Sequence, residues 1–306
     1  MCEPSPLVLA LARTITEQLE MLYPRLAVEV RPARGGSSRK GGKRVPGCPF
    51  HVLKAGSVDA VLAAVEDVPV CLAPGLEVAA VCERLAPYQA LVSHRGSLLD
   101  DIPARGRVGV VDELCRFQLL NHRPDLNITM LHETLDASVK RVRAGRLDGL
   151  IAPVAYLELQ GWQNAVNEVL DSARFLPPVG RGAFALVCTT ESKAREKWLA
   201  GLDDPSTHSA VDAERALLGE MNGLDGLLGA LAEVSGRVLN LEAGVWSSDG
   251  KEVVRDSLGG DMDSATNVGK DLAEKLREDG AGSLFRRGRK SGRSVQESSS
   301  SSTTGE

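Results

Sequence analysis

A carboxylate, a guanidinium and an imidazole are the side chains of this sequence that stand in settings suited to chemistry. Asp67 lies in a short turn just before Pro69. It could act as a general acid or base, or it could cap backbone N–H groups of the turn. Arg181, between two glycines, could contact an anion or could be a solvated loop charge. His132 could be a pH-dependent partner of a carboxylate, or an ordinary polar loop residue.

Two stretches concentrate positive charge. Residues 33–49 are rich in Gly, Ser, Lys and Arg, which predicts a mobile surface loop without a packed element. This loop could close over an anionic ligand or could stay solvated. Residues 285–293 are also basic, and a Ser- and Thr-rich run follows them. Their composition predicts a disordered tail, which could contact an acidic partner or could only solubilise the chain. A tail-mediated interaction protein is thus one class of function, testable by deleting 285–306.

Cysteine and histidine spacing argues against a metal site or a disulfide scaffold. The six cysteines include no CxxC pair, and the five histidines are scattered without an HExxH pattern. We therefore expect no structural zinc and no fold held together by disulfides.

Charge and hydropathy narrow the class of protein. Lys plus Arg is 36 and Asp plus Glu is 41, which gives a net charge of −5, whereas a dedicated nucleic-acid binder has a basic footprint. The chain has 306 residues, of which 43% are apolar, and this length suits two or three domains. No apolar run approaches the roughly 18 residues of a membrane helix. The first residues lack the pattern of a signal peptide. The sequence predicts a soluble cytoplasmic monomer that binds neither membrane nor nucleic acid.

The elements that must position these residues alternate between strand and helix. A helix is expected over 6–22, and Asp112 can cap a second helix that runs to Leu120. A third helix starts at Thr134 or Asp136. The expected short strands cover 26–30, 59–63, 88–92, 108–111, 128–131, 148–152 and 184–188. Such alternation predicts parallel sheets covered by helices. A further unit combines a helix over 209–221, strand-like runs at 230–235 and 237–246, and a helix that ends at Gly280.

Several segments, taken in order, resemble the porphobilinogen deaminase (hydroxymethylbilane synthase) family. DAVLAAVEDVP at 59–69 looks like the family's D-I-A-V-H-S-x-K-D-V-P, and GVVDELCRFQL at 109–119 looks like G-T-S-S-L-R-R-x-x-Q-L. LPPVGRGAFALVC at 176–188 looks like L-P-A-x-G-Q-G-A-x-x-I-E-C. RPDL at 123–126 and AERALL at 213–218 add shorter matches. The shared order and near-constant spacing make the resemblance specific.

The resemblance implies an α/β fold of three domains. Two of them would be lobes like those of periplasmic binding proteins, joined by two hinge strands around a cleft, and the third would be a smaller C-terminal α+β domain. The expected bounds are 1–92 plus 176–205 for lobe 1, 100–175 for lobe 2, 209–282 for the C-terminal domain and 283–306 for the tail.

The family's reaction, in porphyrin (tetrapyrrole) biosynthesis, polymerises four porphobilinogens to hydroxymethylbilane and releases ammonia. The transferase extends a dipyrromethane primer that a thioether holds to one cysteine. Every pyrrole carries an acetate and a propionate, so the cleft needs many guanidinium groups. One aspartate handles pyrrole N–H protons and stabilises the cationic intermediate, and Asp67 stands at that position.

This sequence departs from the family pattern at most positions that bind the primer or the substrate. The departures are Leu224 for the primer cysteine, Leu114 and Cys115 for paired arginines, His132 and Ser138 for two more arginines, Glu66 for a lysine and Arg181 for a glutamine. Cys115 is a speculative new tether, and Arg181, His132 and Ser138 are candidate substrate contacts.

Beside a tail-mediated interaction, two functions remain open. Each lost hydrogen bond to a charged group weakens binding by about 1.5–3 kcal/mol, so polycarboxylates should bind many orders of magnitude more weakly. A missing covalent tether has no equilibrium substitute, and we expect no dipyrromethane here. The chain is then either a divergent, much impaired deaminase, or a pseudoenzyme that binds another small anionic ligand or regulates a true deaminase.

Overall fold

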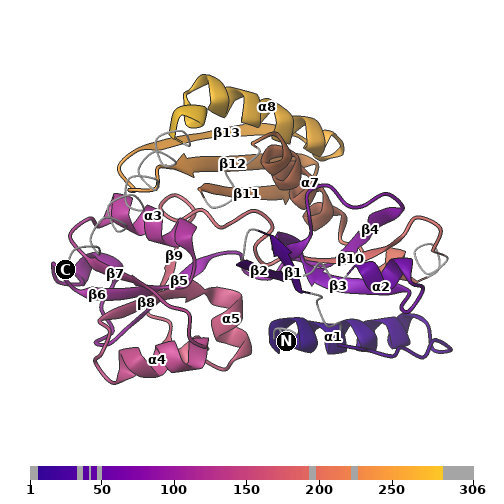
Figure 1. Ribbon diagram of the computed structural model, residues 1–306, viewed down its shortest axis with the longest axis horizontal. Coiled ribbons are helices and arrows are strands. Elements are labelled where there is room, and N and C mark those ends of the chain that lie inside the picture. The colour runs from indigo at the N-terminus through magenta and orange to yellow at the C-terminus, as the bar shows by residue number, and fades with distance from the viewer. Residues whose placement is uncertain are drawn as a thin grey trace, which may run out of the picture.

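Three sheets with their helices form three domains that meet at one junction. The computed structural model describes residues 6–32, 37–40, 43–46, 50–192, 198–221 and 227–284. Two lobes lie side by side, and the C-terminal domain spans both of them (Figure 1). The architecture is the expected one, with two α/β lobes and a smaller α+β domain.

Lobe 1 is built on a small antiparallel sheet. Its strand order is β3 (Ala60–Ala64), β10 (Phe184–Thr189) and β4 (Leu76–Val81). Helix α1 (Pro6–Leu22) buries Ile15 and Leu19 against one face, and α2 (His51–Lys54) covers the other. The expectation of a parallel sheet is wrong for this lobe, because β10 enters it from lobe 2 and pairs antiparallel with both neighbours.

Lobe 2 is a five-stranded mixed sheet. Its order is β7 (Asn127–Met130), β6 (Arg107–Val110), β8 (Gly149–Pro153), β5 (Gln89–Ser93) and β9 (Glu168–Leu170). The helices are α3 (Glu113–His122), α4 (Leu135–Arg143) and α5 (Val154–Leu159). Strand β6 pairs parallel with β7 and β8, whereas β5 pairs antiparallel with β8 and β9. The predicted parallel pairing is therefore right for three strands of this sheet.

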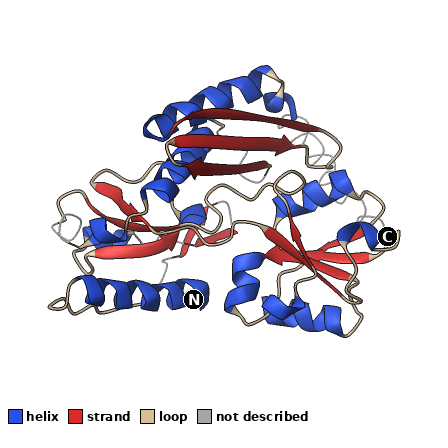
Figure 2. Ribbon diagram, turned by 180° about the vertical axis from the view of Figure 1, so that it is seen from behind, coloured by secondary structure: helices blue, strands red, loops and turns tan. Residues whose placement is uncertain are grey.

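The C-terminal domain packs two helices on one face of an antiparallel sheet (Figure 2). Strands β11 (Leu228–Ser235), β12 (Val238–Trp246) and β13 (Val253–Asp261) form the sheet. Helices α7 (Pro205–Glu220) and α8 (Ala265–Glu278) bury Leu217 and Leu272 against Leu241. Strand β13 was not among the expected strands, since Gly259, Gly260 and charged residues weaken its alternation.

The other expectations from the sequence are partly confirmed and partly wrong. The helix over 6–22 is confirmed, and the strand predictions for β3, β5, β6, β7, β8 and β10 agree to within one residue at each end. Residues 26–30 form no strand. The predicted loop at 33–49 contains a hairpin of β1 (Ser37–Lys40) and β2 (Lys43–Pro46), and the Gly-Gly pair between these strands is typical of a two-residue hairpin loop. Strands β4 and β9 were not predicted.

Short 3₁₀ helices lie between these elements. They are η1 (Val65–Asp67), η2 (Leu99–Asp101), η3 (Gln163–Ala165), η4 (Leu199–Leu202) and η5 (Met262–Ser264). Over the described part of the chain, every helix is too short or too polar to cross a bilayer. The basic tail predicted over 285–306 lies outside the described residues.

Because α7 packs closely against α8, replacing Gly269 by alanine should have an unusual effect on stability. A methyl group added there would overlap the Ala213 carbonyl oxygen and lie 2.9 Å from the Ala216 Cβ. In a free helix, Gly→Ala stabilises by up to about 1 kcal/mol. Here overpacking should reverse the sign, so that Gly269→Ala destabilises by about 1–3 kcal/mol in urea unfolding. Gly282→Ala, which meets no heavy atom within 4 Å, is the matched control and should not destabilise.

Candidate functional site

The two lobes and the loop that leads into β10 meet at a group of charged residues. Glu66 and Asp67 lie in η1 after β3 of lobe 1, and Asp112 follows β6 of lobe 2. Arg181 comes from the loop before β10 and is only 8% exposed. Its Nε lies 3.2 Å from Glu66 Oε2, and its Nη2 lies 3.3 Å from Asp112 Oδ2. One guanidinium therefore bridges the two lobes.

Both carboxylate oxygens of Asp112 accept hydrogen bonds from other groups of this chain. As the expected N-cap of α3, it accepts a 2.7 Å hydrogen bond from the Cys115 backbone N–H through Oδ1. Its Oδ2 accepts a 3.1 Å hydrogen bond from Gln89 Nε2 and the contact from Arg181. The helix N-terminus that faces the lobe junction is thus occupied by a side chain of this protein.

Two glycines set the path of the Arg181 backbone. Gly180 and Gly182 have φ values of +77° and +79°, which side chains with a Cβ rarely adopt. A Cβ on Gly180 would overlap the Val65 side chain, and one on Gly182 would overlap the Leu85 carbonyl oxygen. The glycines therefore let this loop pass close to lobe 1 and to the hinge, residues 82–88, which connects β4 of lobe 1 to β5 of lobe 2.

A buried ion pair fixes this loop to the hinge and to the C-terminal domain. Glu214 of α7 is fully buried and accepts 2.6 and 3.3 Å hydrogen bonds from Arg84. It also accepts the Gly180 N–H at 2.7 Å and the Ala232 N–H at 2.9 Å. Arg84 in turn donates to the Arg181 carbonyl at 2.9 Å. The backbone that carries Arg181 is therefore held by both members of the buried pair.

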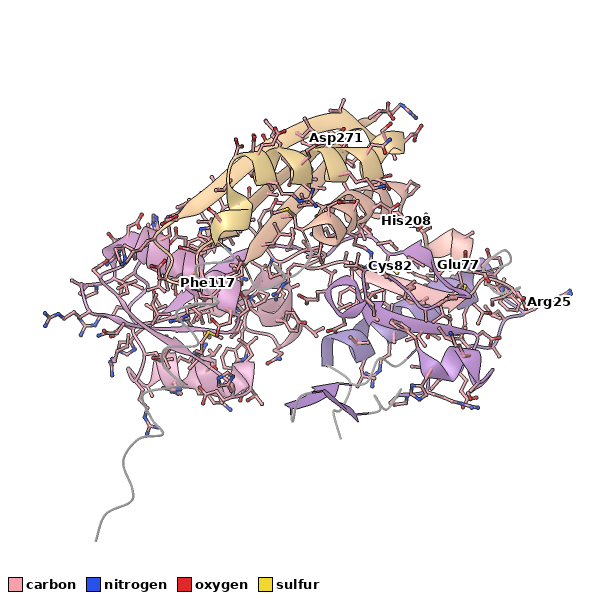
Figure 3. All side chains as sticks on the ribbon, turned by 45° about the horizontal axis from the view of Figure 1, so that its top comes forward. Arg25, Glu77, Cys82, Phe117, His208 and Asp271 are labelled. Carbon is pink, nitrogen blue, oxygen red and sulfur yellow. The ribbon has the colours of Figure 1, made fainter. Side chains whose placement is uncertain are left out.

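Apolar packing closes the junction above α3. Phe117 and Leu114 of α3 pack with Leu176 of the loop before β10. They also pack with Leu231 and Trp246 of the C-terminal sheet. Figure 3 shows Phe117 on lobe 2, beneath the C-terminal domain. The position of a family arginine, Leu114, is therefore part of an interdomain core.

Burial shifts the protonation of both carboxyls on η1. Desolvation raises the pKa of Glu66, with Arg181 opposing the rise and Asp67 and Asp112 adding to it. Desolvation also raises the pKa of Asp67, even though the residue as a whole is exposed, and Arg181 again opposes the rise. Asp67 thus lies next to the lobe junction with an increased tendency to hold a proton.

The remaining candidate residues do not converge on Asp67. Cys115 is 1% exposed, and burial raises the pKa of its thiol well above the usual value, so a thiolate is disfavoured. Ser138 is fully buried in α4, where its hydroxyl lies 3.2 Å from both the Thr134 carbonyl and Glu133 Oε1. His132 is exposed between β7 and α4. Leu224 lies outside the described residues.

Sequence reasoning noticed Glu66 and Arg181 separately but missed their pairing. The signal was present, because an acid replaces a family lysine while a new cation replaces a family glutamine. Gln89, Arg84 and Glu214 gave no such signal, since only the tertiary structure brings them to this point. Among the described residues, no group of three or more His, Cys, Asp or Glu side chains is arranged to hold a metal ion.

Comparison with known proteins identifies the family of this two-lobed protein. Residues 50–197 match the model for "Porphobilinogen deaminase, dipyromethane cofactor binding domain", and residues 208–278 match "Porphobilinogen deaminase, C-terminal domain". A porphobilinogen deaminase of Syntrophobacter fumaroxidans is 32% identical over 287 residues, covering 90% of this chain and 93% of the relative. One from Nocardia farcinica is 36% identical over 243 residues, covering 76% and 70%. The chain belongs to the porphobilinogen deaminase family.

Solved structures show a more distant likeness. A periplasmic aliphatic sulphonate binding protein from Escherichia coli aligns at 18% identity with a TM-score of 0.39, covering 71% of this chain and 68% of that protein. The second substrate binding domain of an amino acid ABC transporter from Streptococcus pneumoniae aligns at 15% identity with a TM-score of 0.40, covering 64% and 81%. Likenesses at this level carry no argument about function.

The residues at the junction do not fit the family's cofactor. A dipyrromethane primer brings several carboxylates, but Arg181 already faces Glu66 and Asp112. The tether position expected from the sequence, Leu224, lies outside the described residues, and the buried Cys115 is poorly suited to replace a thiolate.

Removing the Glu214 carboxylate should weaken the whole junction. Glu214→Ala would leave Arg84 largely buried without a counter-charge and two backbone N–H groups without an acceptor. Loss of one partner of a buried pair costs about 3–5 kcal/mol. Urea unfolding should show a destabilisation of that order, whereas Glu220→Ala at the exposed end of α7 should cost much less. Equal effects of the two variants would contradict the role of this pair.

Replacing Glu66 by glutamine should flatten the pH dependence of stability. Folding raises the Glu66 pKa above its ordinary value of 4.5, so the folded chain holds the proton more tightly than the unfolded chain. Stability from this group is complete below pH 4.5 and falls as the pH rises through the raised pKa. The melting temperature of Glu66→Gln should therefore fall less than that of the wild type as the pH rises above 4.5. Glu274→Gln, an exposed change on α8, should keep the wild-type slope.

Proposed function

We propose that this chain is a pseudoenzyme of the porphobilinogen deaminase family, which retains the fold and has lost the synthesis of hydroxymethylbilane. One observation carries the proposal. The guanidinium at the lobe junction, Arg181, is already paired with Glu66 and Asp112 of the same chain. The cation that this chain places at the family's glutamine position is thus neutralised internally and is not free for a substrate carboxylate.

Electrostatics make displacement of these pairs unfavourable. A substrate carboxylate that reached Arg181 would lie close to Glu66, Asp67 and Asp112. Like charges 4 Å apart repel by about 4 kcal/mol at the effective dielectric constant typical near a protein surface. Each pyrrole adds two carboxylates, so a growing chain meets this repulsion repeatedly. The small anionic ligand expected from the sequence would therefore need a place away from this junction.

At the junction, the described residues also include no suitable thiol for covalent attachment. Leu224 cannot form a thioether, and Cys115 is enclosed by the lobe 2 core with its thiol strongly held in the neutral form. We therefore infer a role in binding or regulation in the cytoplasm, as a monomer, without a dipyrromethane cofactor. Regulation of a true deaminase agrees with the retained fold and does not require an anion at the junction.

A second candidate is residual deaminase activity, and Asp67 is the observation that favours it. Its carboxyl lies at the end of η1, which follows β3, and desolvation raises its pKa against the opposing effect of Arg181, as a proton-transfer group requires. This candidate still needs a tether and cations that the described residues do not supply at the junction.

Intact mass spectrometry with and without porphobilinogen separates the two candidates. The pseudoenzyme should show the mass of the unmodified chain in both samples, and ammonia release should equal the protein-free blank. The Syntrophobacter fumaroxidans relative serves as the positive control for the assay.

Residual catalysis would give the opposite pattern. Stable mass increments of pyrrole units, with ammonia release that Asp67→Asn abolishes, would establish the second candidate. Calorimetry with porphobilinogen gives an independent readout, and tight binding would contradict the internally neutralised junction.

A further inference from the structure

We propose that Glu66, Asp112 and Gln89 form a guanidinium-binding site between the lobes, which Arg181 occupies as an internal ligand that holds the lobes closed. The proposal concerns what this junction can bind, and it is independent of whether the chain retains any catalysis.

The carboxylates that define the site come from different lobes. Glu66 follows β3 of lobe 1, Asp112 follows β6 of lobe 2, and Arg181 contacts both within 3.3 Å. Their side chains are 25% and 20% exposed, and that of Arg181 is 10% exposed. A planar cation with donors on two edges is the ligand chemistry that such opposed carboxylates recognise.

Unpaired polar atoms point independently to a guanidinium ligand. Gln89 is 2% exposed, and its Nε2 donates to Asp112 Oδ2, yet its Oε1 accepts no hydrogen bond from any described residue. Arg181 Nε is buried near Glu66 without an aligned acceptor. The site thus offers an acceptor that Arg181 does not use, and a free guanidinium can orient its five-donor fork without the restraint of a side chain.

The charge at the junction favours a cation. Three carboxyls, of Glu66, Asp67 and Asp112, act on a single guanidinium, and desolvation raises the pKa of the two on η1 while Arg181 opposes the rise. Tyr156 from α5 and Cys115 from α3 also face this group, and neither contributes positive charge. A cationic ligand would therefore be better tolerated at this site than an anionic one.

The backbone around Arg181 is held independently of its side chain. Glu214 accepts the Gly180 N–H, and Arg84 donates to the Arg181 carbonyl. Truncating Arg181 should therefore leave the loop in place and open a space of guanidinium size between the two carboxylates. Small guanidinium compounds are the class of ligand that would fill it.

Chemical rescue tests the site directly. Arg181→Ala should lower the melting temperature and increase the radius of gyration in small-angle scattering, because the link between the lobes is lost. Methylguanidinium chloride should restore both values, whereas sodium chloride at equal ionic strength should not. Calorimetry should show methylguanidinium binding to Arg181→Ala, weakened about tenfold or more in Arg181→Ala/Asp112→Asn, since each charged hydrogen bond contributes about 1.5–3 kcal/mol.

A second variant keeps the test valid if the alanine variant does not fold. Arg181→Gln introduces the residue of the family motif and should also bind methylguanidinium, although more weakly because the amide fills part of the space. Arg181→Lys retains the charge and should show no rescue. Identical effects of methylguanidinium and sodium chloride on both the alanine and glutamine variants would overturn the proposal.

Discussion

Glu214 is the buried charge on which the arrangement of the three domains depends. A carboxylate without solvent is tolerated only when donors surround it, and here Arg84 from the hinge, Gly180 from the loop before β10 and Ala232 from β11 all contribute. These contacts link the C-terminal domain to the connection between the lobes. They also hold the backbone that carries Arg181, so the charged junction takes its geometry from this pair.

At the junction, the fold of the family is kept while the charged residues differ from the family pattern. Apolar side chains that build the cores, such as Val108, Leu150 and Leu272, depend on size and burial alone. The cleft of a deaminase depends on the sign of its charges. Here an acid, Glu66, stands where the family pattern has a lysine, a cation, Arg181, stands where it has a glutamine, and the two side chains pair with each other. The fold is kept with these two replacements, and the proposed loss of polycarboxylate binding rests on them.

Asp67 stands apart from the other family positions because its setting persists. It ends η1, directly after β3 and beside the lobe junction, and its carboxyl is influenced by the guanidinium of Arg181. A carboxyl that can transfer a proton, however, acts only on a substrate that is held within its reach. The retained aspartate and the neutralised junction are therefore compatible within one protein of this family.

Local patterns in the sequence determined α1, the N-cap at Asp112 and six strands of the lobes, because hydrophobic periodicity and capping depend on neighbouring residues. Motif order determined the family. Only the tertiary structure decided that lobe 1 is antiparallel, that Leu114 belongs to an interdomain core, and that Glu66, Arg181 and Asp112 form one network. These features join segments that lie tens of residues apart, and the energy of an ion pair depends on distance and burial, which spacing along a chain does not contain.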